Sequence, residues 1–178
     1  QIDDYRWLAI LATRILKEGG MVIAQVGSVH RFEAECAMRE SSLIPLPLLA
    51  EVYPMAHAQM FEFHVFQGWK PHIWMSKGKR KGEWCFDRVR GNGRSKTRHP
   101  WEDSDAFVTD YIARLTQAEE VVYDPFTGSG IVPAVCKMMG RNWIASEIDP
   151  ITANMAVQRI ADTPVPLLIP EPQQLELV

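Results

Sequence analysis

Two glycines and two carboxylates near the C-terminal end of the chain form the pattern with the clearest chemical meaning. Gly128 and Gly130 follow a short apolar run at 121–123, in the stretch that begins at Asp124. Because glycine has no Cβ atom, a ligand can approach the main chain closely at these positions. Glu147 lies 23 residues after Asp124, at the predicted end of the next strand, where a carboxylate can accept hydrogen bonds from both hydroxyls of a ribose. The pattern therefore predicts a turn that binds a nucleoside.

The features that this turn lacks restrict the kind of nucleoside. The turn is shorter than Gly-x-Gly-x-x-Gly and no Lys follows its glycines, so it is neither the fingerprint of NAD-binding folds nor a phosphate-binding loop. A ligand without phosphates fits better, and S-adenosylmethionine (SAM) is the commonest cofactor of that kind. The alternative is an ordinary strand-to-helix turn, with Glu147 as a surface acid.

A strongly basic stretch lies within a chain whose net charge is −3. Residues 70–98 contain ten Lys and Arg side chains and only two acids, Glu83 and Asp87, so this stretch carries +8 and the rest of the chain −11. Aromatic residues such as Trp74 and Trp84 are interleaved with the cations. Cations bind phosphate and aromatic rings stack on bases, so the stretch predicts a nucleic-acid surface. The alternative is a solvated loop whose lysines only aid solubility.

Length and composition exclude several other classes of protein. With 178 residues, 47% hydrophobic and 23% charged, the chain is expected to be one globular domain, and it contains no apolar run of the roughly 18 residues that a membrane helix needs. Three widely separated cysteines cannot form a closed disulfide framework, which indicates a reducing cytoplasm. No Cys-x-x-Cys or His-Glu-x-x-His pattern occurs, so we expect no zinc site.

The elements that must position these residues alternate between strand and helix. Strands are predicted at 21–26, 121–123 and 142–146, and helices at 31–39, 131–139 and from Asp149-Pro150 to about 160. The segment 43–53 is apolar and interrupted by prolines, which favours an edge strand or an extended segment, and 60–75 reads as two strands around Gly68. This alternation predicts an α/β fold.

These residues resemble a known family. The stretches "VVYDPFTGSG" at 121–130 and "GRNWIASEID" at 140–149 resemble the SAM-binding motif and the following strand of amino-type DNA methyltransferases, which modify adenine N6 or cytosine N4. The order of parts is similar to the β class, in which the cofactor motif comes late. The stretch "RHPWEDSDAFVTDYI" at 98–112 is similar to a variant found in phages and mobile elements, except that Asp103 stands where Gln is usual.

The resemblance implies a fold and a set of site residues. The fold would be a Rossmann-like SAM-methyltransferase sandwich of three layers, a single domain over 1–178 with a mixed, mostly parallel sheet and a DNA-facing insertion at 69–99. The residues implied to bind SAM are Asp124, Pro125, Phe126, Thr127, Gly128, Ser129, Gly130, Glu147, Ile148, Trp101 and Ser104. The residues implied to grip double-stranded DNA, from which the target base is flipped out, are Lys77, Lys79, Arg80, Lys81, Arg88, Arg90, Arg94 and Lys96.

One part that the resemblance requires is missing from the sequence. The family's catalytic motif, Asp-Pro-Pro-Tyr or a close variant, does not occur, and the first residue is Gln1. In this family the catalytic strand lies between the motif I strand and the strand assigned to 21–26, so the sheet would lack one central strand. We expect the natural protein to extend upstream of Gln1 and to carry the motif there. The alternatives are an inactive relative that only binds SAM or DNA, and a SAM enzyme acting on a small molecule or a protein.

Overall fold

The computed structural model describes residues 2–60, 64–80, 82, 84–91 and 105–165. The chain divides into two compact units, residues 1–93 and residues 94–178. Each unit is described by itself. The expected single domain with an insertion at 69–99 stays a prediction.

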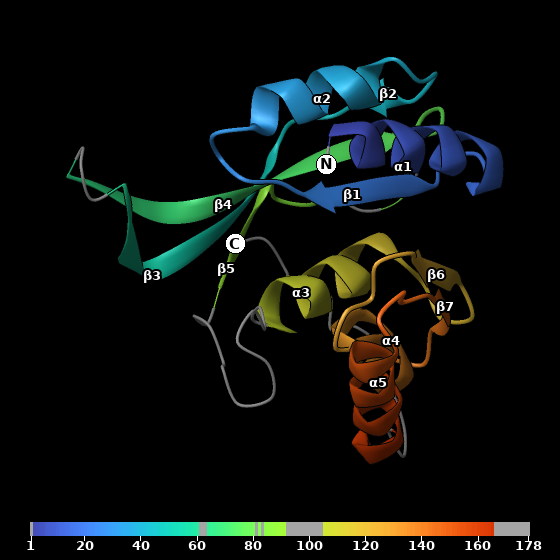
Figure 1. Cartoon of the computed structure of the whole chain (residues 1–178). Coiled ribbons are helices and arrows are strands. Elements are labelled where there is room, and N and C mark those ends of the chain that lie inside the picture. The colour runs from blue at the N-terminus through green and yellow to red at the C-terminus, as the bar shows by residue number, and fades with distance from the viewer. Residues whose placement is uncertain (1, 61–63, 81, 83, 92–104, 166–178) are drawn as a thin grey trace, which may run out of the picture. The chain divides into compact units, whose positions relative to one another are not determined.

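The first unit is a layer of two helices on a five-stranded sheet (Figure 1). Its sheet has the strand order β1-β4-β3-β5, and β2 pairs with β4 outside this path. The elements in chain order are α1 (Ile2–Ile15), β1 (Met21–Gln25), α2 (Arg31–Arg39), β2 (Ile44–Pro45), β3 (Leu49–Met60), β4 (Val65–Ser76) and β5 (Arg88–Arg90).

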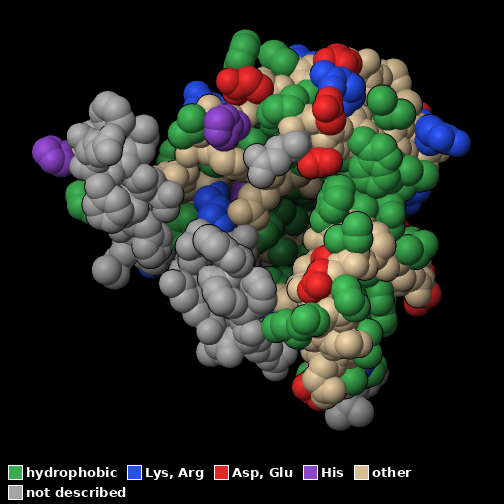
Figure 2. All heavy atoms as spheres, viewed as in Figure 1, with side chains coloured by type: hydrophobic (Ala, Val, Ile, Leu, Met, Phe, Trp, Pro, Cys, Tyr) green, Lys and Arg blue, Asp and Glu red, His purple; other side chains and the backbone are tan. Residues whose placement is uncertain are grey.

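Small side chains allow the two helices to approach the sheet and each other closely. Ala9 and Ala12 of α1 and Ala34 of α2 are buried against Ile73 and Met75 of β4. Acidic and basic side chains lie next to one another over the helices, among exposed apolar ones such as Ile10 and Phe32 (Figure 2). The helices are therefore amphipathic, with their apolar face on the sheet, as expected for the outer layer of an α/β fold.

The sheet of the first unit is mixed, as predicted, but its parallel part is smaller than expected. β4 pairs antiparallel with β1, β2 and β3, and only the short β3–β5 pair is parallel. The longest of these pairs, β3–β4, is antiparallel because the two strands follow each other directly and form a hairpin.

Two expectations for the middle of the chain differ from the structure. β4 runs without a break through Gly68, instead of forming two strands around it, and the reversal of direction lies before Val65. β3 lies between β4 and β5 rather than at an edge. Gly68 and the prolines at 45 and 47 are of types that often interrupt strands. Tertiary pairing along the hairpin nevertheless decides which residues form strands.

The second unit contains a parallel strand pair joined through a helix. Its elements are α3 (Asp105–Leu115), β6 (Val121–Asp124), α4 (Ile131–Met138), β7 (Asn142–Ala145) and α5 (Pro150–Asp162). β6 and β7 are parallel, with Val121 opposite Asn142 and Asp124 opposite Ala145. Val108 and Ile112 of α3 pack with Val135 and Cys136 of α4 in a buried cluster. The α/β prediction is confirmed, because a parallel pair requires such a crossover.

Both strands that flank the predicted gap are edge strands among the described residues. β1 ends the order of the larger sheet, and β6 pairs only with β7. The missing central strand stays a prediction. Among the helices that the structure describes, none is both long and apolar enough to cross a membrane.

Candidate cofactor site and nucleic-acid surface

The predicted glycine turn lies between β6 and α4 in the second unit. β6 ends at Asp124 and α4 begins at Ile131, so residues 125–130 connect them. Gly128 and Gly130 have positive φ angles of 53° and 82°. These values lie in the left-handed region, which glycine adopts without steric cost.

The two glycines have different surroundings. A Cβ atom placed on Gly130 would lie 2.8 Å from the Cα and Cβ atoms of Ala156 in α5, whereas one placed on Gly128 would meet nothing within 4 Å. Gly130 therefore permits α5 to pack against the turn. Gly128 leaves its side of the main chain open, as an approaching ligand requires.

Glu147 is joined directly to the glycine turn. Its Oε2 atom accepts a hydrogen bond from the Gly128 N–H at 2.9 Å. Its Oε1 atom accepts from the N–H groups of Ile148 at 2.9 Å and Asp149 at 3.0 Å. A carboxylate offers about four acceptor positions, two on each oxygen. Bonds among the described residues occupy three of these positions, which leaves one on Oε2, beside the turn.

Asp124 is the second carboxylate of this site. Its Oδ1 atom accepts a hydrogen bond from the Phe126 N–H at 3.1 Å. Burial raises the pKa of Asp124, the Phe126 N–H opposes that rise, and the negative charge of Glu147 adds to it. Two neighbouring carboxylates at one turn create a negative local potential that favours a cationic ligand.

Apolar side chains stand exposed beside the two acids. Ile148, directly after Glu147, is 98% exposed, and Phe126 in the turn is 59% exposed. Ile151, which the sequence analysis did not select, is 73% exposed at the start of α5. These side chains offer apolar surface beside the hydrogen-bonding groups of the turn.

The structure also contains residues at this site that the sequence analysis missed. Ser146 continues the pairing beyond β7, because its N–H donates to the Asp124 carbonyl at 3.0 Å and its own carbonyl accepts from Thr127 N–H at 3.0 Å. Arg159 of α5 donates from Nη1 to the Ser129 hydroxyl at 3.2 Å. The latter contact joins residues 30 positions apart, so no local pattern could have indicated it.

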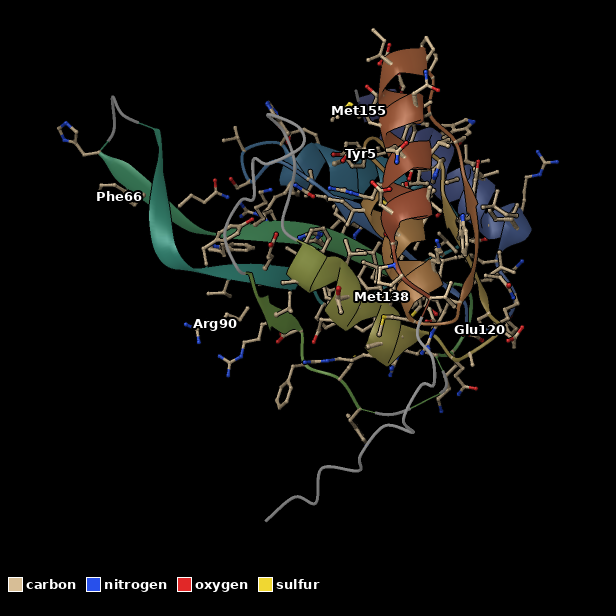
Figure 3. All side chains as sticks on the ribbon, turned by 90° about the horizontal axis from the view of Figure 1, so that it is seen from below. Tyr5, Phe66, Arg90, Glu120, Met138 and Met155 are labelled. Atoms are coloured by element: carbon tan, nitrogen blue, oxygen red, sulfur yellow. The ribbon has the colours of Figure 1, made fainter. Side chains whose placement is uncertain are left out.

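The structure places five of the predicted DNA-binding residues, all in the first unit. Arg88 and Arg90 are exposed on β5 and flank the buried Val89, so both point away from the interior. Arg90 projects from the ribbon into solvent (Figure 3). Lys79 is exposed and Lys77 and Arg80 are half-buried in the segment after β4. The predicted residues Trp101, Ser104, Lys81, Arg94 and Lys96 lie outside the described residues.

Comparison with known proteins decides the family. A sequence model described as DNA methylase, of the N6/N4 type, matches residues 64–158, which is more than half of the chain. The chain belongs to this N6/N4 DNA methylase family. The match includes the glycine turn, Glu147 and the whole basic stretch, and it confirms the family to which the sequence motifs pointed.

Curated relatives of the methylase match over part of their length. The type II methyltransferase M.BglII of Bacillus subtilis is 30% identical over 88 residues, which are 49% of this chain and 24% of that protein. M.HpaI of Haemophilus parainfluenzae is 30% identical over 77 residues, 43% of this chain and 24% of that protein. The methylase chain thus spans about a quarter of the length of these relatives.

Solved structures agree with the methylase fold. The M1.HpyAVI–SAM complex matches with a TM-score of 0.76 and 18% identity, over 90% of this chain and 84% of that one. The PvuII cytosine-N4-specific DNA methyltransferase matches with a TM-score of 0.77 and 17% identity, over 93% of this chain and 72% of that one. At these identities the likeness establishes the fold, and it confirms the predicted Rossmann-like methyltransferase class.

Proposed function

We propose that this methylase chain carries the SAM-binding part of a DNA amino-methyltransferase. The protein would transfer a methyl group from SAM to the exocyclic amino group of adenine or cytosine in double-stranded DNA. The observation that carries the proposal is the bond from Gly128 N–H to Glu147 Oε2, because it puts the predicted ribose acid and the predicted glycine turn in one place. In the sequence, the two are related only by their spacing.

The residues of the site fit SAM chemically. SAM has a positive ammonium group and a positive sulfonium centre, and the carboxylates of Asp124 and Glu147 supply the matching charge. The acceptor position that remains on Glu147 Oε2 among the described residues suits one ribose hydroxyl. A hydrogen bond to the second hydroxyl would require the bond from Gly128 N–H to Oε2 to weaken or break. Ile148 and Phe126 would cover the adenine ring. SAM would supply the electrophilic methyl group.

The basic side chains would hold the DNA backbone. Lys79, Arg88 and Arg90 are exposed, and such cations bind phosphates regardless of sequence. The target base would leave the helix, because chemistry on an exocyclic amino group inside a duplex requires flipping. Membership of the phage-like subgroup is part of this proposal, and it rests on Trp101 and Ser104, which lie outside the described residues.

A methyl-transfer assay separates an enzyme from an inactive relative. The assay would use SAM labelled in its methyl group, duplex DNA, and nucleoside analysis of the product. We expect that a longer natural protein with a carboxylate-Pro-Pro-aromatic motif upstream produces N6-methyladenine or N4-methylcytosine. We expect the 178-residue chain alone to bind SAM without transferring its methyl group.

Three other outcomes would change the proposal. Label at carbon 5 of cytosine would contradict the amino-type chemistry. Methyl transfer by the 178-residue chain alone would show that the catalytic groups lie within it. If a longer protein bound SAM and DNA and transferred nothing, the inactive relative would be the correct interpretation.

A further inference from the structure

We propose that Arg159 is a positioning residue that holds the glycine turn in the conformation that binds the cofactor. The inference rests on the proposed function, because it assigns a role to Arg159 within the same site. Arg159 lies in the third turn of α5, and its Nη1 atom donates to the Ser129 hydroxyl at 3.2 Å.

Ser129 lies in the part of the turn whose main chain is costliest to order. It stands between Gly128 and Gly130, both with positive φ angles. Glycine loses more conformational freedom on ordering than any other residue, so a segment with two glycines around one serine is costly to fix. The hydroxyl of Ser129 is a side-chain acceptor within this segment, and Arg159 donates a hydrogen bond to it.

The glycine turn is thus held at two consecutive residues from two directions. Gly128 N–H bonds to Glu147 Oε2, and Ser129 Oγ accepts from Arg159. Both partners belong to one segment of the chain, because Glu147 lies just before α5 and Arg159 lies within it. The connection that leads into α5 and the helix itself therefore each contribute one contact to the turn.

The helix α5 is a firm support for such contacts. Its N-terminus is capped by Asp149, whose Oδ2 accepts from the Thr152 N–H at 2.8 Å. Ala156 packs against Gly130, and the Ile160 carbonyl accepts from Lys137 Nζ at 2.6 Å. Functional groups held on a supported helix keep their geometry better than groups on loops. If Arg159 fixes the turn before ligand arrives, SAM binding loses less conformational entropy.

Three variants test whether Arg159 acts through Ser129. Arg159→Met keeps most of the stem and removes the donor, Ser129→Ala removes the acceptor, and the double variant removes both. Isothermal titration with SAM should show a loss of affinity of roughly five- to tenfold for each single variant, the scale of one net hydrogen bond. The double variant should lose no more than either single variant, because both remove the same contact. Arg159→Lys, which keeps a donor, should recover part of the loss.

Lys137→Met is the matched control. It removes another cation that holds the last turn of α5, through the carbonyls of Ile160 and Ala161 instead of through the glycine turn. We expect this variant to lower the melting temperature and to change SAM affinity less than twofold. If Lys137→Met weakened SAM binding as much as Arg159→Met, general support of α5 would explain the effect and the proposal would be wrong.

Amide hydrogen exchange tests, without any ligand, whether the bond from Arg159 to Ser129 orders the glycine turn. Arg159→Met should speed exchange at residues 128–130, and Lys137→Met should leave it unchanged. Unchanged exchange in Arg159→Met, or additive affinity losses in the double variant, would overturn the inference. A wild-type protein that bound no SAM would instead contradict the proposed function, and the cofactor role of Arg159 with it.

Discussion

At the scale of single residues, the site depends on how a few polar groups share their hydrogen bonds. Glu147 gives three of its acceptor positions to its own chain and keeps one beside the turn. Asp124 is half-buried and bonds to Phe126 N–H. One carboxylate thus organises the main chain while the other brings a second negative charge to the same place.

The half-buried position of Asp124 predicts a pH dependence of stability. Burial raises the pKa of Asp124 above its usual 3.8 in the folded state, so the folded protein binds this proton more tightly than the unfolded chain. Well below pH 3.8 both states are protonated and the residue adds no pH dependence. As the pH rises from 3.8 to the raised pKa, the free energy of unfolding should fall, and above that pKa both states are ionised and the contribution of Asp124 is constant.

Asp124→Asn checks this prediction, because the amide oxygen can still accept from Phe126 N–H and cannot ionise. Urea unfolding between about pH 3.5 and pH 7 should show wild-type stability falling relative to Asp124→Asn as the pH rises. Asp162→Asn, which changes an exposed carboxylate on α5, is the control. A wild type that gained stability relative to Asp124→Asn over this range would show that ionised Asp124 is stabilised in the fold.

At the scale of elements, the strand–turn–helix–strand unit from β6 to β7 and the helix α5 form the candidate site. The turn needs glycine at two positions, and both have a positive φ angle. Gly128 also leaves open space beside the main chain, whereas Gly130 permits α5 to pack closely against the turn. β6 and β7 also expose Val121 and Ile144 at 60% and 59%.

Alanine at the two glycines should therefore have different effects. Gly128→Ala should cost about 1–2 kcal/mol of stability from the left-handed conformation alone. Gly130→Ala should cost more, about 2 kcal/mol or above, because its methyl group also meets the main chain of Ala156. Urea unfolding of both variants measures the difference. Equal losses would mean that α5 does not pack on the turn as the structure has it.

At the scale of the whole molecule, the basic stretch should give DNA binding a strong salt dependence. Removing one cation that binds a phosphate should reduce the slope of log K against log salt by roughly 0.9. For Arg88→Gln with Arg90→Gln, we expect a reduction of roughly one to two on nonspecific duplex DNA. Arg14→Gln, at an exposed cation in the last turn of α1, is the control. An unchanged slope in the double variant would mean that β5 is a solvated surface.

The sequence predicted the local parts of this molecule better than the distant ones. The glycine turn, the strand predicted at 142–146 and the Asp149–Pro150 helix start depend on neighbouring residues, and the structure confirms them, with the strand one residue shorter. The unbroken β4, the interior position of β3 and the contact of Arg159 with Ser129 depend on residues far apart in the chain. Those features are decided by tertiary packing, which periodicity and turn residues do not encode.

Equilibrium binding of SAM to the wild type and to Glu147→Ala tests whether the glycine turn and Glu147 form the cofactor site. We expect saturable binding of one SAM per chain, weakened in Glu147→Ala by roughly 1–3 kcal/mol, the scale of a lost hydrogen bond to a charged group. Asp162→Ala, which removes an exposed carboxylate from α5, should bind as the wild type does. Absence of SAM binding in the folded wild type, or equal affinity in Glu147→Ala, would contradict the assignment of this turn as the cofactor site.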